Sequence, residues 1–472
     1  MNNHITQNKL DVFITHFLRK AYIVLEKNKL TLLRYYFLSP IVVLIGAWPC
    51  SPYFPGVIFH FLIAVSAGFL FIVTNYFFLT KKEDSFGEIQ LNKFKIFTKN
   101  KIKYSFILIS LITILNGPRH DYKSYVRQWL LIFNGNDPWI GTDNAYGPIH
   151  NLFSLFAVIN PIIPKFIFVV VFFYSFYKLN FTNYKLIKGK DNISNKILSL
   201  IVSMCPVLII VAPLNANNDT LVCGLVIYAL FIHLSLDGSK KAQLISGILF
   251  GFASMIKVYP LIVSIPFLIR NFKIKFTFLI SLSSTLFAII FLSYTVWGNS
   301  IFQPILFASG RESTHFSIFY FLRSTFNLNI DSFNTLLMIL VMVIIFFIIQ
   351  YNNIDLIPST IIIFLPVLSI YKVAHIQFFL FFFATLPLLA RYLKQYDLNE
   401  LKTLCISYLV LLGFLNFYIS FSHLTCGMYV GPASKFRDHF GAMIYLPIIL
   451  NLIIQFIKTT SKKPKLFSTK QI

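Results

Sequence analysis

Residues 120–151, HDYKSYVRQWLLIFNGNDPWIGTDNAYGPIHN, place the carboxylates of Asp121, Asp137 and Asp143 in a short polar stretch of a chain rich in Phe, Ile and Leu. A carboxylate at the edge of an apolar protein can take a proton from a sugar hydroxyl as a general base. Asp121 suits this role, because a predicted helix directly after it would fix its position. It can also cap that helix, and the two roles are compatible. Asp137 lies in the turn sequence NGNDPW and can act by shaping that turn.

The predicted helix after Asp121 is amphipathic. Apolar and aromatic residues recur with helical spacing at Tyr122, Tyr125, Val126, Trp129, Leu130 and Phe133. We expect this helix to lie in the membrane interface with its aromatic face among the lipid headgroups. It would then hold Asp121 at the boundary between water and lipid. Trp129, Trp139 and Tyr146 have two possible roles, stacking on sugar rings or forming an aromatic belt at the interface.

Two further segments place polar residues beside apolar helices. In NANNDTL (215–221), Asp219 and the asparagines can cap the helix that begins there or bind the hydroxyls of an acceptor. In SMIKVYP (254–260), Lys257 lies between two apolar helices and is followed by a proline break. An isolated ammonium in that position needs an anion, and a lipid phosphate or pyrophosphate would provide one. The alternative is that Lys257 extends to the outer headgroups.

Cationic and histidine side chains recur in two later segments. The segment 308–324, ASGRESTHFSIFYFLRS, carries Arg311, Glu312 and His315, and 369–382, SIYKVAHIQFFLFF, carries Lys372, His375 and Gln377. With Lys257 these groups would form a cationic collar at the outer membrane edge, above Phe- and Ile-rich helices that can hold a polyprenyl tail. The chain has no P-loop, no GxGxxG after a strand and no HExxH. This excludes a nucleotide-sugar enzyme with a cytosolic Rossmann domain.

The elements that must position these groups are membrane-spanning helices. The chain of 472 residues is 57% hydrophobic and 12% charged, whereas soluble domains carry about 25% charged residues. Apolar runs that can cross a bilayer core of about 30 Å recur along it, without the alternation of barrel strands. The sequence predicts an all-α, polytopic transmembrane bundle of about 12–14 crossings. The crossings are expected near 36–49, 56–80, 104–117, 160–180, 197–213, 219–236, 243–257, 259–270, 276–296, 333–351, 357–371, 375–391, 402–421 and 439–457.

The distribution of Lys and Arg predicts the orientation of this bundle. These residues are roughly threefold more numerous on the side that holds both termini, so both termini are expected in the cytoplasm. The net charge of +24 is therefore assigned to cytoplasmic loops, including a lysine-rich inner loop at 81–103, and not to nucleic-acid binding. The first apolar run begins near Tyr35 without a small-residue cleavage site, and we expect no cleaved signal peptide.

The chain is predicted to form a single integral membrane domain, residues 1–472. Its two large outer loops would be 117–159, with catalytic residues, and 297–332. The short segment 259–270 can form a broken or re-entrant pair with 243–257. The cysteines are Cys50, Cys205, Cys223, Cys405 and Cys426. They form no CxxC pair, so metal ligation is not expected, and a disulfide between outward-facing Cys50 and Cys426 stays open.

In four segments the chain resembles the GT-C fold glycosyltransferases that use lipid-phosphate sugars. It is most similar to the bacterial polyprenyl-phosphate-mannose-dependent family and to the catalytic subunit of GPI mannosyltransferase I. The segments are HDYKSYVRQWLLIFNGNDPW…NAYGPIHNLF, the stretch from NNDTL to KVYPLIVSIPFLIR, GRESTHFSIFYFLRS and YKVAHIQFFLFFFATLP. The similarity covers most of 117–390. The chain departs from the family's D-x-D pattern, because Asp121 stands alone before Tyr122 and Tyr125. At the family's Y-x-P segment the chain reads Tyr146, Gly147 and Pro148.

The resemblance implies an inverting transfer of a hexose, mannose as the first choice, on the outer or lumenal face. The donor would be a polyprenyl- or dolichyl-phosphate sugar and the acceptor a glycan or glycolipid. Asp121 would be the catalytic base. The substrate-binding residues would be Tyr122, Tyr146, Asp219, Lys257, Tyr259, Arg311, Glu312, His315, Lys372 and Gln377. Lys257, Arg311, His315 and Lys372 would neutralise the departing phosphate.

No metal or other cofactor is expected, and the partners would be the two substrates and membrane lipids. The expected location is the bacterial inner membrane. Two alternatives remain open from the sequence: a transporter or flippase for lipid-linked sugars, and an O-antigen-type polymerase.

Overall fold

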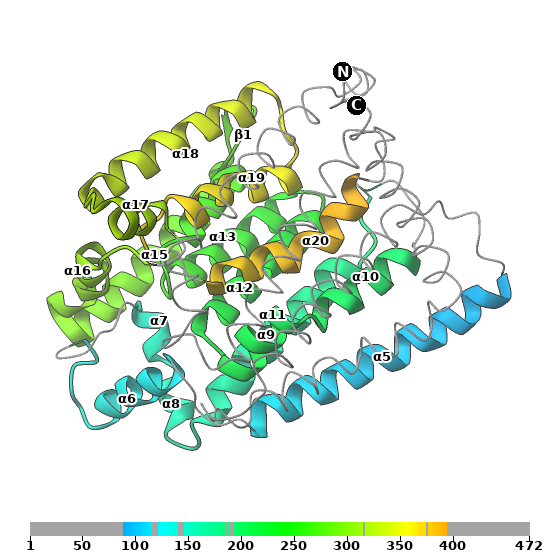
Figure 1. Cartoon of the computed structure of the whole chain (residues 1–472), viewed down its shortest axis with the longest axis horizontal. Coiled ribbons are helices and arrows are strands. Elements are labelled where there is room, and N and C mark those ends of the chain that lie inside the picture. Colours follow the sequence, from blue (N-terminus) through cyan, green and yellow to red (C-terminus); the bar gives the residue numbers. More distant parts are fainter. Residues whose placement is uncertain are drawn as a thin grey trace, which may run out of the picture.

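The structure is a computed structural model that describes residues 88–115, 121–139, 146–185, 187, 193–314, 317–373 and 376–393. These residues are mostly helical (Figure 1). The longer helices are α5 (Glu88–Leu115), α6 (Asp121–Phe133), α9 (Ile162–Phe181), α10 (Ile193–Ser203), α12 (Asn218–Ser235), α13 (Lys240–Ser254), α15 (Phe276–Trp297), α18 (Asn334–Tyr351), α19 (Leu356–Ser369) and α20 (Leu380–Leu393). The shorter ones are α7 (Pro148–Asn151), α8 (Ser154–Ala157), α11 (Pro206–Ile209), α14 (Pro260–Leu268), α16 (Gln303–Gly310) and α17 (Ile318–Phe326).

Among the described residues, four helical segments are long and apolar enough to cross a membrane. They are Ile162–Phe181, Asn218–Ser235, Phe276–Gly310 and Asp331–Tyr351. Each predicted crossing that falls on described residues contains a helix. The predicted crossings 36–49, 56–80, 402–421 and 439–457, and with them the Cys50–Cys426 disulfide, lie outside the described residues.

The expectation of an inner loop over 81–103 is wrong from Glu88 onward. Helix α5 begins there and continues for 28 residues to Leu115. At 1.5 Å per residue this is about 42 Å, longer than the bilayer core. From Glu88 onward, the lysines of this stretch therefore lie on α5 and not in a loop.

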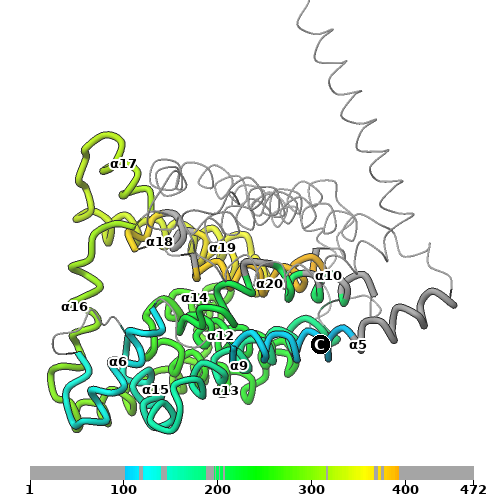
Figure 2. Tube along the Cα trace, turned by 60° about the horizontal axis from the view of Figure 1, so that its bottom comes forward, coloured from blue at the N-terminus to red at the C-terminus, as the bar shows by residue number. Residues whose placement is uncertain are grey.

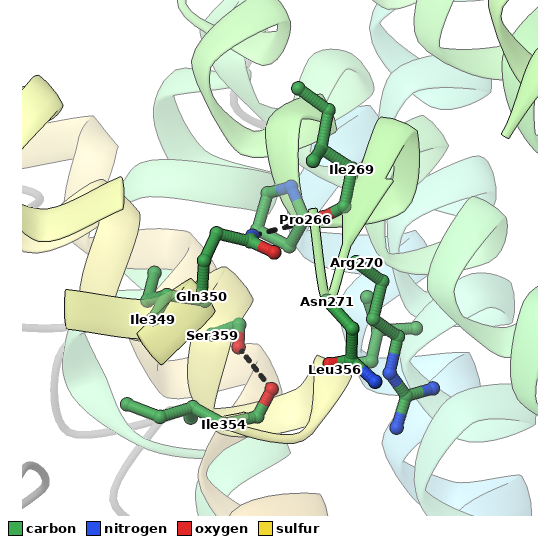
Figure 3. A pocket seen from close by; sticks show the side chains of 9 residues that line it. All are labelled: Pro266, Ile269, Arg270, Asn271, Ile349, Gln350, Ile354, Leu356 and Ser359. Carbon is green, nitrogen blue, oxygen red and sulfur yellow. Dashed lines mark hydrogen bonds between the residues drawn. The ribbon is translucent and has the colours of Figure 1, made fainter. Parts of the chain in front are cut away.

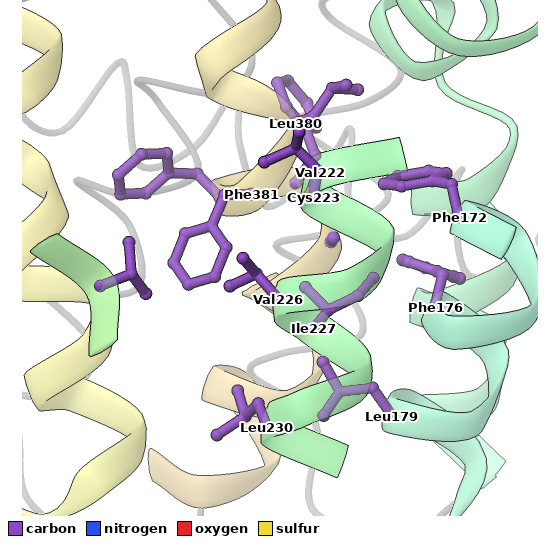
Figure 4. Close-up of a cluster of buried hydrophobic side chains, with 14 of the residues drawn as sticks. Phe172, Phe176, Leu179, Val222, Cys223, Val226, Ile227, Leu230, Leu380 and Phe381 are labelled. Carbon is purple, nitrogen blue, oxygen red and sulfur yellow. The ribbon is translucent and has the colours of Figure 1, made fainter. Parts of the chain in front are cut away.

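Helix α12 forms the centre of the bundle. Figure 4 shows it between α9 and α20, with Phe172 and Phe176 on one side and Phe381 on the other. Most of its residues are buried, and its apolar side chains are spread around the helix, as in helices enclosed on every side. Gly224 allows α9 to come close, because a Cβ there would lie 3.0 Å from the Cα of Phe172. The beginning of α12 is thus held by several neighbouring helices.

Helices α13 and α15 pack closely through two glycines one turn apart. A Cβ at Gly247 would lie 1.8 Å from Oγ of Ser281, and a Cβ at Gly251 would lie 2.7 Å from the side chain of Thr285. This spacing is the GxxxG pattern with which membrane helices approach one another. The contact fixes α13, and with it the segment that follows at Met255.

The chain breaks its helices at two neighbouring places. One break separates α13 from α14 and contains Lys257, as the short predicted segment 259–270 suggested. The other follows a π-helical turn, Ile210–Asn215, where Ala216 adopts a left-handed conformation with φ of 49° before α12 begins. Such turns free backbone groups and are frequent at functional sites.

Contacts between loops show which loops lie together at each of the two ends of the described bundle. At the first end, Tyr125 lies 3.4 Å from Oδ1 of Asn218, and the backbone of Thr314 donates to the carbonyl of Lys372 at 2.7 Å. Helices α6, α7, α8, α16 and α17 gather at this end (Figures 1 and 2). All of these segments were predicted to lie on the outer side.

The second end joins segments that were predicted to lie on the inner side. Arg270 pairs with Asp355 at 3.2 Å, and Arg391 donates to Asn183 at 2.8 Å. Here β1 (Ile269–Arg270) and β2 (Lys273–Ile274) form a short antiparallel hairpin. A small cavity beside it has about 10 Å³ for water (Figure 3), room for about one molecule.

Candidate functional site at the first end of the bundle

Helix α6 holds Asp121 at the edge of the site. The helix is amphipathic as predicted. The expectation that its aromatic face lies among lipid headgroups is wrong for three of its rings, whereas Leu130 and Phe133 of the same face are 50% and 62% exposed. Tyr122, Tyr125 and Trp129 are 0%, 0% and 1% exposed and pack against the protein. The hydroxyl of Tyr122 donates to the carbonyl of Pro161 at 2.6 Å, as expected for a buried aromatic with a polar end. This packing fixes the exposed Asp121 at the first residue of the helix.

Tyr146 reaches the centre of the site because of the glycine after it. The backbone N–H of Gly147 donates to the carbonyl of Ile256 at 3.0 Å. A Cβ on Gly147 would lie 2.2 Å from the carbonyl oxygen of Met255, so the close approach requires glycine. The carbonyl of Tyr146 accepts from Nε1 of Trp139 at 2.9 Å.

Trp139 and Trp129 are both structural residues. Trp139 is 4% exposed and packs edge-on against Trp297. Its backbone N–H donates to Asp137 at 2.8 Å, so Asp137 shapes this turn. Trp129 donates through Nε1 to the carbonyl of His150 at 2.9 Å. Both rings are buried, which excludes them from an aromatic belt and from stacking on an exposed sugar in this conformation.

Lys257 and Asp219 form a buried ion pair at the two helix breaks. Nζ of Lys257 lies 2.5 Å from Oδ2 of Asp219, and the two side chains are 15% and 0% exposed. The expectation that Lys257 is an isolated ammonium is therefore wrong, because its anion is Asp219. Asp219 does not cap α12 either, since the N-cap residue is Asn217. The Tyr259 hydroxyl also interacts with the Asp219 carboxylate.

Aromatic rings surround the ammonium of Lys257. Nζ lies 5.4 Å from the ring centroid of Tyr146 and 5.7 Å from that of Phe378, within the range of cation–π attraction. The ring of Tyr259 packs on Phe378 at 5.1 Å. Gln377, which precedes Phe378, is 8% exposed. The structure thus brings Tyr146, Lys257 and Tyr259 together, next to the segment that carries Gln377.

His150 lies under these residues in an aromatic cage. Its ring is 4.8 Å from Tyr125, 5.0 Å from Tyr146 and 5.0 Å from Trp129. Burial lowers the pKa of His150 to about 3, and the positive charge of Lys257 contributes. The imidazole is therefore neutral at physiological pH. His150 was not among the predicted site residues.

The charges of Asp121, Asp219 and Arg311 all act on Tyr146. Burial raises the pKa of this phenol, the negative charge of Asp121 raises it further, and the positive charge of Arg311 opposes the shift. Asp219 raises it too. Asp121, the predicted base, is thus close enough to Tyr146 for its negative charge to act on this phenol.

The segment predicted as the second outer loop, together with Lys372, contributes both ion-paired side chains and cations without an acidic partner among the described residues. Glu312 pairs with Arg323 at 3.0 Å, and Arg323 also lies 3.6 Å from Asp331. Glu312 therefore belongs to an ion-pair cluster within the loop. Lys372 donates to the carbonyl of Ser309 at 2.6 Å, which leaves its positive charge uncompensated by an acid in the described part of the chain. Arg311 likewise has no carboxylate partner among the described residues and stacks on the ring of Phe307. The predicted site residue His315 lies outside the described residues.

Buried polar atoms with unused hydrogen-bonding capacity gather beside the ion pair. In the described part of the chain they include Oδ1 of Asn215, Oδ1 of Asn217, Nδ2 of Asn218, Oδ1 of Asp219 and Oγ1 of Thr220. Both ring nitrogens of His150 and Nδ2 of Asn151 belong to the same set. Buried polar atoms are rarely left unpaired in native proteins. The start of α12 can therefore bind water or the hydroxyls of a ligand.

Lys165 supports this site and was missed in the sequence. It is fully buried in α9 and donates from Nζ to the carbonyl of Leu214 at 3.1 Å. A cation in this position satisfies a carbonyl at the end of the π-helical turn. The signal was a single lysine in the apolar sequence PIIPKFIFVV.

In the described residues no group of three or more His, Cys, Asp or Glu side chains could hold a metal ion. Compared with protein-family models, the chain matches none, and compared with curated proteins it has no significant match either. The arrangement of the site itself therefore carries the functional argument.

Proposed function

We propose that the chain is a membrane glycosyltransferase that transfers a hexose, mannose as the first choice, from a polyprenyl- or dolichyl-phosphate donor to a glycan or glycolipid acceptor. The observation that carries the proposal is the position of Asp121. This exposed carboxylate lies at the same end of an apolar helical bundle as a buried ion pair and a group of hydrogen-bonding atoms that lack partners among the described residues. A lipid-linked sugar likewise combines a polar head with a long apolar tail.

In the proposed mechanism Asp121 acts as the general base. An acceptor hydroxyl gives its proton to the Asp121 carboxylate while its oxygen attacks the anomeric carbon of the donor sugar from the face opposite the phosphate. The bond from that carbon to the phosphate oxygen breaks, and polyprenyl phosphate leaves with the electron pair. The product is the glycosidic bond with inverted configuration.

Arg311 of the second outer loop and Lys372 are the natural partners of the departing phosphate. Arg311 and Lys372 have no acidic partner among the described residues, so their charges are available to the negative charge that grows on the leaving oxygen. Lys257 is partly neutralised by Asp219. We assign this pair to the floor of the site, where it orients Tyr146 and Tyr259 toward the substrates.

The same proposal includes the architecture and location of the enzyme. It would be a bundle of the GT-C type with about 12–14 crossings, both termini in the cytoplasm, in a bacterial inner membrane. The site would then face outward. The candidate spans favour an enzyme over a transporter, because α15 and α18 carry no charged residues. Asp219 lies in the first turn of α12, and the two lysines of α9 lie in its first and last turns. A transporter needs polar groups near the middle of the membrane.

The test is sugar transfer by purified protein in proteoliposomes with radiolabelled polyprenyl-phosphate mannose and a panel of acceptors. We expect the conservative variant Asp121→Asn to lose transfer by about 10²–10⁴-fold, the contribution of a general base. Asp137→Asn is the matched control, since the amide oxygen can still accept from the backbone of Trp139. It should transfer at the wild-type rate.

Two results would overturn the proposal. One is wild-type transfer by Asp121→Asn. The other is movement of intact donor across the bilayer with no release of polyprenyl phosphate, which is what a transporter does. The analogous donors with glucose and galactose in the same assay identify the sugar.

A further inference from the structure

The β1–β2 hairpin at the second end of the bundle has an unusual turn. Asn271 and Phe272 join the strands and both have left-handed backbones, with φ of 52° and 57°. Asn tolerates this conformation, but a bulky residue such as Phe adopts it at a cost. The turn therefore presents an aromatic side chain at a position where glycine would fit more easily.

Gln350 of α18 holds the hairpin in this conformation. Its Oε1 accepts from the backbone N–H of Phe272 at 3.0 Å, and its Nε2 donates to the carbonyl of Ile269 at 3.1 Å. Gln350 is 3% exposed, and Figure 3 shows it directed toward the hairpin. The exposed position of Phe272 is thus fixed by one contact on β1 and one on the turn itself.

The hairpin concentrates positive charge. Arg270 and Lys273 are directly opposite each other across the strands, and Lys275 follows two residues later. Like charges in that arrangement repel. Asp355 pairs with Arg270 at 3.2 Å, but Lys273 has no acidic partner among the described residues. An external anion at the tip would relieve this repulsion.

Exposed apolar side chains alternate with these cations. Phe272, Ile274 and Phe276 are 51%, 47% and 67% exposed, and Tyr351 at the end of α18 is 74% exposed. The ring of Phe272 packs edge-on against Tyr351 at 5.3 Å. Aromatic rings and cations in alternation are typical of the headgroup layer of a membrane.

The depth of the hairpin fits that layer. It lies between the ends of two candidate membrane spans, since Phe276 begins one and Tyr351 ends the other. Figure 1 shows β1 beside this end of α18. A water-soluble anionic partner would have to cover the exposed rings as well, whereas a lipid satisfies the cations and the rings at once.

We propose that this hairpin is a binding site for the headgroup phosphate of an anionic membrane lipid. Arg270 and Lys273 bind the phosphate, and Phe272, Phe276 and Tyr351 lie along the first carbons of the acyl chains. The proposal is independent of the sugar-transfer function, because it concerns the opposite end of the bundle.

The test compares phosphatidylglycerol with phosphatidylcholine of identical acyl chains. Each lipid is titrated into the detergent-solubilised full chain, and lipid adducts are counted by native mass spectrometry. We expect tighter binding of phosphatidylglycerol, and Lys273→Gln should weaken it about fivefold, corresponding to about 1 kcal/mol per basic residue near an anionic surface. Lys185→Gln is the matched control, an 89% exposed lysine that is not part of the hairpin, and should bind like wild type.

Three results would overturn the proposal. They are equal binding of the two lipids by wild type, unchanged phosphatidylglycerol binding in Lys273→Gln, and displacement of the lipid by inorganic phosphate at the same concentration. The last would indicate a site for a free anion. Thermal unfolding of Lys273→Gln in detergent without lipid verifies that the variant is folded.

Discussion

At the scale of single residues, the Lys257–Asp219 pair determines how the charges of the candidate site combine. Lys257 comes from the break after α13 and Asp219 from the first turn of α12, and both are largely removed from water. Two charges that compensate one another in this way are costly to separate, because the remaining one has no solvent to stabilise it. The pair therefore contributes more to the structure of the site than either charge contributes alone.

A comparison of single and double variants measures this effect. Lys257→Met should lower the free energy of unfolding by about 3–5 kcal/mol, since it leaves Asp219 buried without its cation. The double variant Lys257→Met/Asp219→Leu should recover most of the loss. Thermal unfolding in detergent is the measurement. Equal losses in the single and double variants would contradict the prediction.

The exposed pair Lys185–Asp237 provides the control for that series. Its side chains are 89% and 42% exposed, with 3.3 Å between the charged atoms. Ion pairs of this kind contribute about 0–1 kcal/mol. Lys185→Met should therefore unfold close to the wild-type temperature.

The lowered pKa of the buried His150 predicts that the free energy of unfolding depends on pH. Because burial lowers its pKa from 6.5 to about 3, the folded chain leaves it neutral at a pH where the unfolded chain protonates it. Its stabilising contribution is complete above pH 6.5 and is lost as the pH falls toward 3, by up to about 1.4 kcal/mol per pH unit. His150→Phe removes this titration. The free energy of unfolding of both proteins is measured between pH 8 and 5. Wild type should lose more stability than His150→Phe as the pH falls. Parallel profiles would refute the burial of a neutral His150.

The partners of these residues could not be predicted from the sequence. Asp219 and Lys257 are 38 residues apart, and their contact depends on how α12 packs against the end of α13. The sequence did identify Asp121, Tyr146 and Lys257 as polar residues at helix ends on one side. It did not identify His150 or Lys165 as parts of the site, because nothing local distinguishes a caged histidine from an exposed one.

At the scale of elements, the helix break between α13 and α14 is the feature that creates the site. Pro260 starts α14 and removes a backbone donor, so this break was visible in the sequence. The opposite holds for the aromatic face of α6. Its spacing predicted an apolar face, but the spacing is the same whether lipid or protein covers that face. The Gly247–Gly251 spacing on α13 was an available signal for close packing that the sequence analysis did not use.

Gly147 joins the first outer loop to this break. Gly147→Ala places a methyl group against the backbone carbonyl of Met255. We expect a loss of about 1–3 kcal/mol in the free energy of unfolding, as for other overpacked sites, together with weaker sugar transfer because Tyr146 moves away from Lys257. Thermal unfolding and the transfer assay measure the two effects.

Gly310 is the matched control for Gly147. An added Cβ there meets no atom within 4 Å, and alanine is favoured over glycine in helices. Gly310→Ala should be neutral or slightly stabilising. If both substitutions gave the same unfolding temperature, the close approach of Gly147 to Met255 would have no energetic importance.

At the scale of the whole molecule, the described bundle separates two kinds of surface. The first end gathers Asp121, Tyr146 and the Lys257–Asp219 pair, and the second end gathers the basic hairpin and the Arg270–Asp355 pair. Between them lie apolar helices with exposed side chains, such as Phe287 at 71% and Phe291 at 56%. This order was predictable because alternate loops must lie on opposite sides of a membrane. The distribution of basic residues then predicts that the first end lies outside.

Thiol labelling tests that assignment in intact cells. In a background with the native cysteines replaced, single cysteines would be introduced at Asn136 on the first outer loop, at Lys273 on the hairpin and at Phe287 on the apolar surface. Asn136→Cys should react with a membrane-impermeant maleimide added outside, because its position is exposed and the positive-inside rule puts that loop outside. Lys273→Cys should react only after the membrane is opened. Phe287→Cys should react in neither case, since a thiol within lipid is not ionised. Labelling of Lys273→Cys in intact cells, with Asn136→Cys protected, would reverse the orientation and place the proposed sugar-transfer site in the cytoplasm.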